Sequence, residues 1–184
     1  MWPWGHAALG YLLYRVVLPS RGRPWPPSDG TAIALAVGTQ FPDLIDKPLA
    51  WSFGLIPSGR SLAHSLVLAT IVCLLVVTIA RRSGQSKPAW AFAFGYYAHL
   101  LGDALLPILQ LDAEFLSFLA WPLLPPPPYE SDSSFLEHIL NLSPTPFTLF
   151  GLLLTVFAMG IWIYDGYPGL RWLGTESGTP VSND

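Results

Sequence analysis

Five strongly apolar segments dominate the chain and leave it few ways to fold. They cover about 5–18, 31–46, 62–80, 89–106 and 147–164. The third and fifth have the roughly 20 residues that a helix needs to cross a bilayer. The first two are shorter, so they are extended by their flanks, thin the bilayer locally or pack within the bundle as partial spans. Only 11% of the residues are charged, against about 25% in a soluble domain. We therefore expect an all-α, polytopic membrane bundle of about five hydrophobic helices.

The connections between these segments are rich in Pro, Gly and Ser. They fit a single membrane domain over 1–167, followed by a mobile polar tail over 168–184. The long connection 107–146 is predicted to be an outer loop with an apolar segment in the membrane interface and a stiff spacer at Pro125–Pro128. The single cysteine, Cys73, is interpreted as a packing residue. A net charge of −3 without a basic stripe predicts that no nucleic acid is bound.

The basic residues predict an orientation in the membrane. If all five segments cross, seven of the nine basic residues fall on one side: Arg15, Arg21, Arg23, Arg81, Arg82, Lys87 and Arg171. The positive-inside rule places that side in the cytoplasm of a multi-pass plasma-membrane or inner-membrane protein, with the N-terminus outside and the C-terminus inside. No Lys or Arg precedes the first apolar run, so we expect this run to be retained and not removed as a signal peptide.

In this topology, the ionisable residues of the apolar segments fall in one layer near the outer leaflet. They are His6, Asp43, Asp46, His64, His99 and Asp103. An acid at mid-bilayer costs about 2.5–3.5 kcal/mol, so each such residue needs a partner or a function. Imidazoles and carboxylates are groups that bind Zn, Mn or Fe and activate water. The set therefore predicts a centre for one or two divalent ions, with Zn favoured over Mn or Fe.

Each pattern also has a purely structural explanation. His99 and Asp103 are four residues apart on one helix face, which suits a shared metal but equally a hydrogen bond between helices. Asp43 and Asp46 share one helical turn, and a helix cap or a surface turn with Lys47 as counter-ion would explain them without a metal.

The segment Gly59–Ser65 contributes two further candidates. Arg60 is able to clamp a phosphate with two hydrogen bonds, although an arginine reaching for the membrane interface is equally consistent. Ser61 is expected to cap the third helix, which puts His64 in its first turn. Ser65 is either a hydrogen-bond partner of a ligand or a small packing residue, and the packing role is favoured.

Two further roles are expectations from the chemistry of carboxylates and imidazoles. Asp46 is a candidate for orienting an attacking water. If the long loop folds back as a lid, Glu137 or His138 would add a ligand or a general acid, although a solvated loop histidine is the simpler interpretation.

Together these motifs resemble the YdjM-like family of membrane-bound metal-dependent hydrolases, which are LexA-regulated inner-membrane proteins. The resemblance covers about 1–125 and is carried by Gly5-His6, Pro42-Asp43-Leu44-Ile45-Asp46, Arg60-Ser61-Leu62-Ala63-His64-Ser65, His99-Leu100-Leu101-Gly102-Asp103 and a late Trp121-Pro122-Leu123. The third motif of the family begins with a histidine where this chain has Gly59. The order of the ligands is similar, more distantly, to that of zinc-dependent phospholipase C, which implies phosphoester substrates.

The resemblance and the residues together favour a membrane-embedded hydrolase of a phosphoester, such as a lipid head group or a small molecule, with membrane lipid as its partner. Asp46 and Arg60 are then the candidate catalytic residues. A non-enzymatic metal-binding or transport protein is the alternative, and a structural protein whose histidines pair with acids is a third. A carrier needs polar groups along a path through the bilayer, and the inner halves of 62–80 and 147–164 offer almost none.

Overall fold

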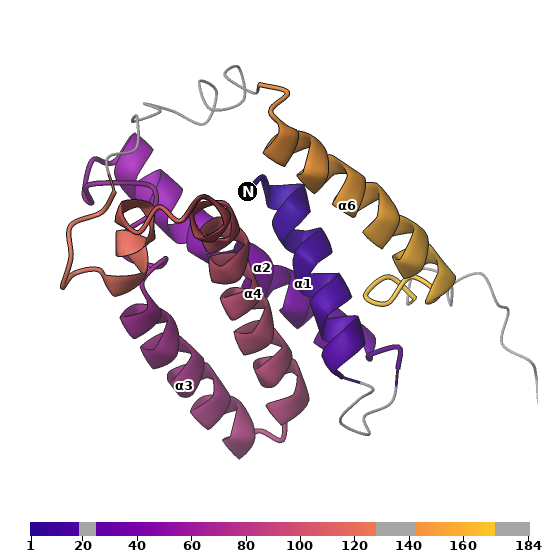
Figure 1. Ribbon diagram of the computed structural model, residues 1–184. Coiled ribbons are helices and arrows are strands. Elements are labelled where there is room, and N and C mark those ends of the chain that lie inside the picture. Colours follow the sequence, from indigo (N-terminus) through magenta and orange to yellow (C-terminus); the bar gives the residue numbers. More distant parts are fainter. Residues whose placement is uncertain (19–24, 128–142, 172–184) are drawn as a thin grey trace, which may run out of the picture.

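The protein's computed structural model describes residues 1–18, 25–127 and 143–171, and every regular element within these ranges is helical (Figure 1). The α-helices are α1 (Pro3–Val17), α2 (Asp29–Lys47), α3 (Leu66–Arg82), α4 (Ser86–Gln110) and α6 (Pro146–Tyr164). A π-helix, η2 (Pro48–Ser52), extends α2, and a 3-10 helix, η3 (Glu114–Ala120), follows α4. The all-α prediction is confirmed for these ranges, and each of the five apolar segments supplies one α-helix.

The ends of the helices follow from local sequence. The Ser65 hydroxyl caps α3 by accepting hydrogen bonds from the amides of Val67 and Leu68, and Thr145 caps α6 in the same way. The prediction that Ser61 caps the third helix is therefore wrong, as is the interpretation of Ser65 as a packing residue. α4 also runs past Pro107 and ends at Gln110, followed by Leu111 in a left-handed conformation, so the long loop begins at 111 and not at 107.

Helix α4 is the centre of the bundle and packs against α1, α2 and α3 (Figure 1). It meets α2 at two glycines. A Cβ atom on Gly95 would collide with the carbonyl oxygen of Leu35, and one on Gly38 would collide with the carbonyl oxygen of Phe92. The two backbones therefore touch, as small residues allow between membrane helices. This close crossing fixes the middle of α2 against the N-terminal half of α4.

The apolar core between α3 and α4 is small. It consists of Ala69, Cys73, Phe92, Ala93, Tyr96 and Leu100. The interpretation of Cys73 as a packing residue is confirmed, since its side chain is buried in this cluster. The Tyr96 hydroxyl donates to the carbonyl oxygen of Ala63 at 2.7 Å and so ties the turn before α3 to α4.

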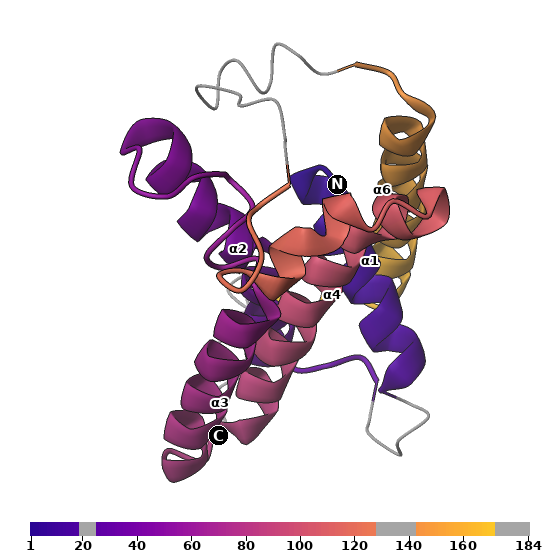
Figure 2. The same ribbon diagram turned by 60° about the vertical axis from the view of Figure 1, so that its left-hand side comes forward.

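Two helices in the described ranges are long and apolar enough to cross a membrane, α4 and α6. Their surroundings differ: 61% of the most apolar stretch of α4 is buried inside the protein, against 11% for α6. The two views explain this difference in burial (Figures 1 and 2). α6 lies at the edge of the bundle, beside α1, whereas α4 is flanked by α3. The prediction of about five spans is not confirmed, because α1 and α3 have only 15 and 17 residues.

Two predictions concern the loops. In the apolar segment after α4, Phe118 of η3 is fully buried and its apolar neighbours are half-buried; the position of this segment in the membrane interface stays a prediction. The tail was expected to be mobile from 168, but its start is fixed to α2, because Asp29 accepts hydrogen bonds from the Gly169 amide and the Arg171 guanidinium. Pro128, Glu137, His138 and the tail from 172 lie outside the described residues.

Candidate metal centre

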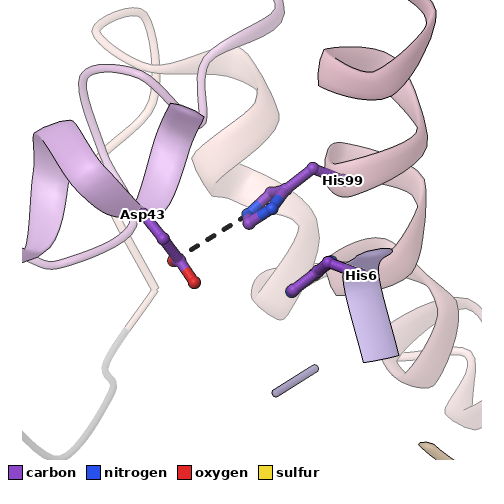
Figure 3. A group of neighbouring side chains, drawn as sticks. All are labelled: His6, Asp43 and His99. Carbon is purple, nitrogen blue, oxygen red and sulfur yellow. Dashed lines mark ion pairs between the residues drawn. The ribbon is translucent and has the colours of Figure 1, made fainter. Parts of the chain in front are cut away.

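All six polar residues that the sequence singles out meet in one buried cluster. They come from α1 (His6), α2 (Asp43 and Asp46), the turn before α3 (His64) and α4 (His99 and Asp103). Each is between 0% and 7% exposed. Figure 3 shows three of them, His6, Asp43 and His99, facing one another from three helices. These distant parts of the chain therefore meet in one place, and the prediction that this place lies near the outer leaflet stays a prediction.

Hydrogen bonds fix the protonation of the two central imidazoles. Nδ1 of His99 lies 2.7 Å from the backbone carbonyl oxygen of Thr39, which is able only to accept, so this nitrogen carries a hydrogen. Nδ1 of His64 lies 2.8 Å from a carboxylate oxygen of Asp46 and must donate as well. In the neutral rings, both Nε2 atoms are then lone-pair acceptors, and they lie only 3.1 Å apart. Two lone pairs at this distance repel unless a cation lies between them.

Two carboxylates complete this electron-rich cluster. Oδ1 of Asp43 lies 3.5 Å from Nε2 of His64 and 3.8 Å from Nε2 of His99. Oδ2 of Asp103 lies 3.5 and 3.7 Å from the same two atoms. Ligands of a tetrahedral zinc ion, at about 2.0–2.2 Å from the metal, lie about 3.4 Å apart. Each of the two carboxylate oxygens therefore lies at about ligand spacing from both imidazole nitrogens.

His6 extends the cluster on the α1 side. Its ring stacks on His99 with 3.7 Å between centroids, and its Nε2 lies 3.2 Å from Oδ1 of Asp103. Neither of its ring nitrogens has a hydrogen-bond partner among the described residues, although both are buried. Gly102 makes this approach available, because a Cβ atom there would lie 2.9 Å from the His6 ring. Unsatisfied buried nitrogens of this kind are expected where an ion or water belongs.

The candidate ligands form two overlapping groups. His64, His99 and Asp103 make one, and His6, Asp43 and His99 make the other, with ligand atoms within 4.8 Å of one another in each. Both groups include His99. Its Nδ1 donates to Thr39, so only its Nε2 is left to bind a metal ion. Because one imidazole nitrogen binds one ion, the two groups describe a single centre, and a second ion would need His6 and a bridging carboxylate.

Asp46 has a different place from the other acids. Its carboxylate accepts hydrogen bonds from the backbone amides of Ser61, Ala63 and His64, at 2.7–3.2 Å, as well as from the His64 ring. Neither ligand group includes it. These four donors explain why the turn at 61–64 stays out of α3, and they make Asp46 a residue that positions His64. Carboxylates that orient metal-binding histidines in this way are common.

Three cationic groups border the cluster. Lys47 donates to Oδ2 of Asp43 at 2.7 Å, so its predicted role as counter-ion is present. Arg60 donates to both oxygens of Asp103, at 2.8 and 3.3 Å, and the Met1 amine also contacts Asp103. The Arg60 side chain is 28% exposed, so the cluster comes closest to the protein surface at Arg60.

The field of the carboxylates favours positive charge at the centre. Burial lowers the pKa of His64, but hydrogen bonds to Asp103, Asp43 and Asp46 outweigh it and raise the pKa to about 10. A metal ion or a proton on His64 would satisfy this field equally, and experiments on metal content distinguish them.

Sequence reasoning missed several residues that support the centre. The Thr39 carbonyl oxygen orients His99. Ser65 donates to the carbonyl oxygen of Trp121 at 2.5 Å, and the Phe118 ring packs edge-on against His64. In the sequence, the Trp121-Pro122 motif indicated such a contact, because the loop after α4 returns to the histidines at Trp121.

Removing the charge of Asp46 tests its positioning role. In Asp46→Asn, we expect metal affinity to fall by about 10–100-fold, the usual effect of losing a partner behind a metal-binding histidine. Glu114→Gln, at an exposed position on η3, is the matched control and should bind metal like the parent protein. Zinc titration by calorimetry measures both. Unchanged affinity in Asp46→Asn would contradict the role.

The fold and the site define a class: a helical membrane protein with a buried histidine–aspartate cluster suited to a divalent cation. The family comparison makes this specific. The chain belongs to the YdjM inner membrane protein family, whose model matches residues 1–165. No curated protein and no solved structure matches the chain. The more distant similarity to zinc-dependent phospholipase C therefore rests on ligand order alone.

Proposed function

We propose that this protein is a metal-dependent hydrolase of the inner membrane that cleaves a phosphoester, such as a lipid head group. One observation carries the proposal: the Nε2 atoms of His64 and His99 face each other at 3.1 Å with two carboxylates beside them. Bound zinc would lower the pKa of a water ligand to about 7 and supply hydroxide near neutral pH. Mn or Fe would suit the same ligands.

The residues around the centre have separate tasks in this proposal. His64, His99, Asp43 and Asp103 hold the metal, and His6 adds a ligand or receives a second ion. Asp46 keeps His64 in the correct tautomer, which replaces the earlier expectation that it orients the attacking water. Arg60 turns from Asp103 to the phosphate of the substrate, with which a guanidinium forms two parallel hydrogen bonds.

The position of the centre in the bundle supports an opening at the outer leaflet. Gly5, next to His6, packs on Gly151 near the start of α6. At the other end, Arg15 pairs with Asp165 directly after α6, and Arg81 and Arg82 end α3. The positive-inside rule then puts the basic end in the cytoplasm and the metal centre towards the outer side of a multi-pass protein.

The burial of the cluster favours a second candidate, a non-enzymatic metal-binding or transport protein. All six polar residues are at most 7% exposed, so a substrate reaches the centre only if Arg60 and the Met1 amine move away from Asp103. A metal held for structure or transfer has no such requirement. Activity measurements on metal-loaded protein separate the two candidates.

The test uses the full chain, purified in mild detergent and loaded with Zn or Mn. Phosphomonoesters, phosphodiesters and phospholipids are assayed with parent protein, His99→Ala and Arg60→Lys. We expect metal-dependent activity that His99→Ala abolishes, and a KM about tenfold higher in Arg60→Lys, because one bidentate hydrogen bond of about 1.5 kcal/mol is lost. Bound metal without turnover over the whole panel would reject the hydrolase in favour of the second candidate.

A further inference from the structure

A second feature lies on the other side of α1 from the metal centre. α1, α2 and α6 enclose a groove with a cavity volume of about 310 Å³. It is lined by Trp4, Ala7, Ala8, Tyr11, Ala32, Leu35, Ala36, Thr155, Ala158, Met159, Trp162 and Pro168. None of the six candidate metal-centre residues lines it.

Small side chains create the hollow. The alanines of α1 and α2 form its floor, and Met159 on α6 is 51% exposed at its edge. α1 and α6 run parallel, since Gly5 lies beside Gly151 and the Tyr11 hydroxyl binds Asp165. The groove therefore follows the axis of α6 through the second half of this apolar helix. Both views show α6 standing at the outer edge of the bundle (Figures 1 and 2).

Three of the four polar side chains in the walls have hydrogen-bond partners within the protein, and the fourth is Trp4. The Tyr11 hydroxyl donates to Asp165, the Thr155 hydroxyl donates to the carbonyl oxygen of Gly151, and the Trp162 indole donates to that of Pro168. No charged residue lines the groove. Apart from the Trp4 indole, a ligand would find apolar contacts, which disfavours polar metabolites and suits a plain hydrocarbon chain.

We propose that this groove binds one acyl chain of a membrane lipid. The helix that forms its outer wall has only 11% of its apolar stretch buried, so in an inner-membrane protein the groove adjoins bilayer hydrocarbon. A chain lying along α6 would fill the hollow with the dense contacts that apolar interiors require. This proposal concerns a lipid site and does not depend on whether the metal centre is catalytic.

The experiment uses the full chain in nanodiscs that contain a phospholipid with a diazirine at mid-chain. After irradiation, mass spectrometry maps the labelled peptides. We expect labelling to concentrate on the groove residues of α1, α2 and α6, and to be lost in Ala7→Phe/Ala36→Phe, which fills the groove at two exposed alanines. Val156→Phe, at an α6 position that is 60% exposed and outside the groove, is the matched control and should keep the labelling.

Two further measurements complete the experiment: a check of folding and a second photoreactive probe. Thermal melting checks that the filled variant is folded, and single variants Ala7→Phe and Ala36→Phe replace it if it is not. A free fatty acid with the same diazirine tests whether the chain alone suffices; its capture in the same peptides supports an acyl-chain site. Labelling spread evenly over the exposed face of α6, or labelling that persists in folded, filled variants, would overturn the proposal.

Discussion

Replacing His99 by alanine is expected to remove the metal from the purified protein. Parent protein loaded with zinc should retain about one ion per chain after gel filtration, as a site with two imidazoles and two carboxylates does. His99→Ala loses the nitrogen shared by both ligand groups. Since even residues behind the ligands contribute about 10–100-fold, we expect affinity to fall by more than about 100-fold. Elemental analysis after dialysis measures the ion content.

Tyr97→Phe is the matched control for this variant. Tyr97 lies two residues before His99 on α4, and its hydroxyl contacts Thr70 on the exposed side of the bundle. It should bind zinc like the parent protein. If the parent protein binds no divalent metal and its melting temperature does not respond to zinc or EDTA, the cation between His64 and His99 is a proton on His64, and the metal centre is rejected.

The helices were predictable because apolar length alone indicates them. The limits of all five segments lie within four residues of the helix ends. Membrane crossing was less predictable, because an apolar helix that packs in a core and one that faces lipid have the same composition. α4 and α6 show this: both are apolar enough to span, but only α6 leaves most of its surface exposed.

The site was predictable in its members but not in their roles. His99 and Asp103 follow from helical spacing, whereas the contact of His64 with Asp46 joins residues 18 positions apart through a turn with no repeating pattern. The sequence predicted both Asp43 and Asp46 as metal ligands and Asp46 also as the residue that orients the attacking water. Only the backbone amides of Ser61, Ala63 and His64, which converge on Asp46, separate a positioning carboxylate from a ligand.

The crossing of α2 and α4 connects the fold with the site. Gly95 sits where a Cβ atom would collide with the Leu35 carbonyl oxygen and lie 3.0 Å from the Thr39 amide. The carbonyl of the same Thr39 orients His99 one turn further along α4. A group added at Gly95 therefore pushes apart the two helices that carry Asp43 and His99. Because the obstacles are backbone atoms, no side-chain rotation relieves the contact.

A single methyl group tests this dependence. Alanine is favoured over glycine inside helices by about 1 kcal/mol, yet in Gly95→Ala we expect a net loss of about 1–3 kcal/mol from overpacking, together with weaker zinc binding. Gly160→Ala on α6 is the control, because nothing lies within 4 Å of its added Cβ; its melting temperature should stay level or rise. Thermal melting and zinc titration of both proteins decide the matter. If Gly95→Ala is as stable as Gly160→Ala and binds zinc equally well, the helices do not need backbone contact to assemble the centre.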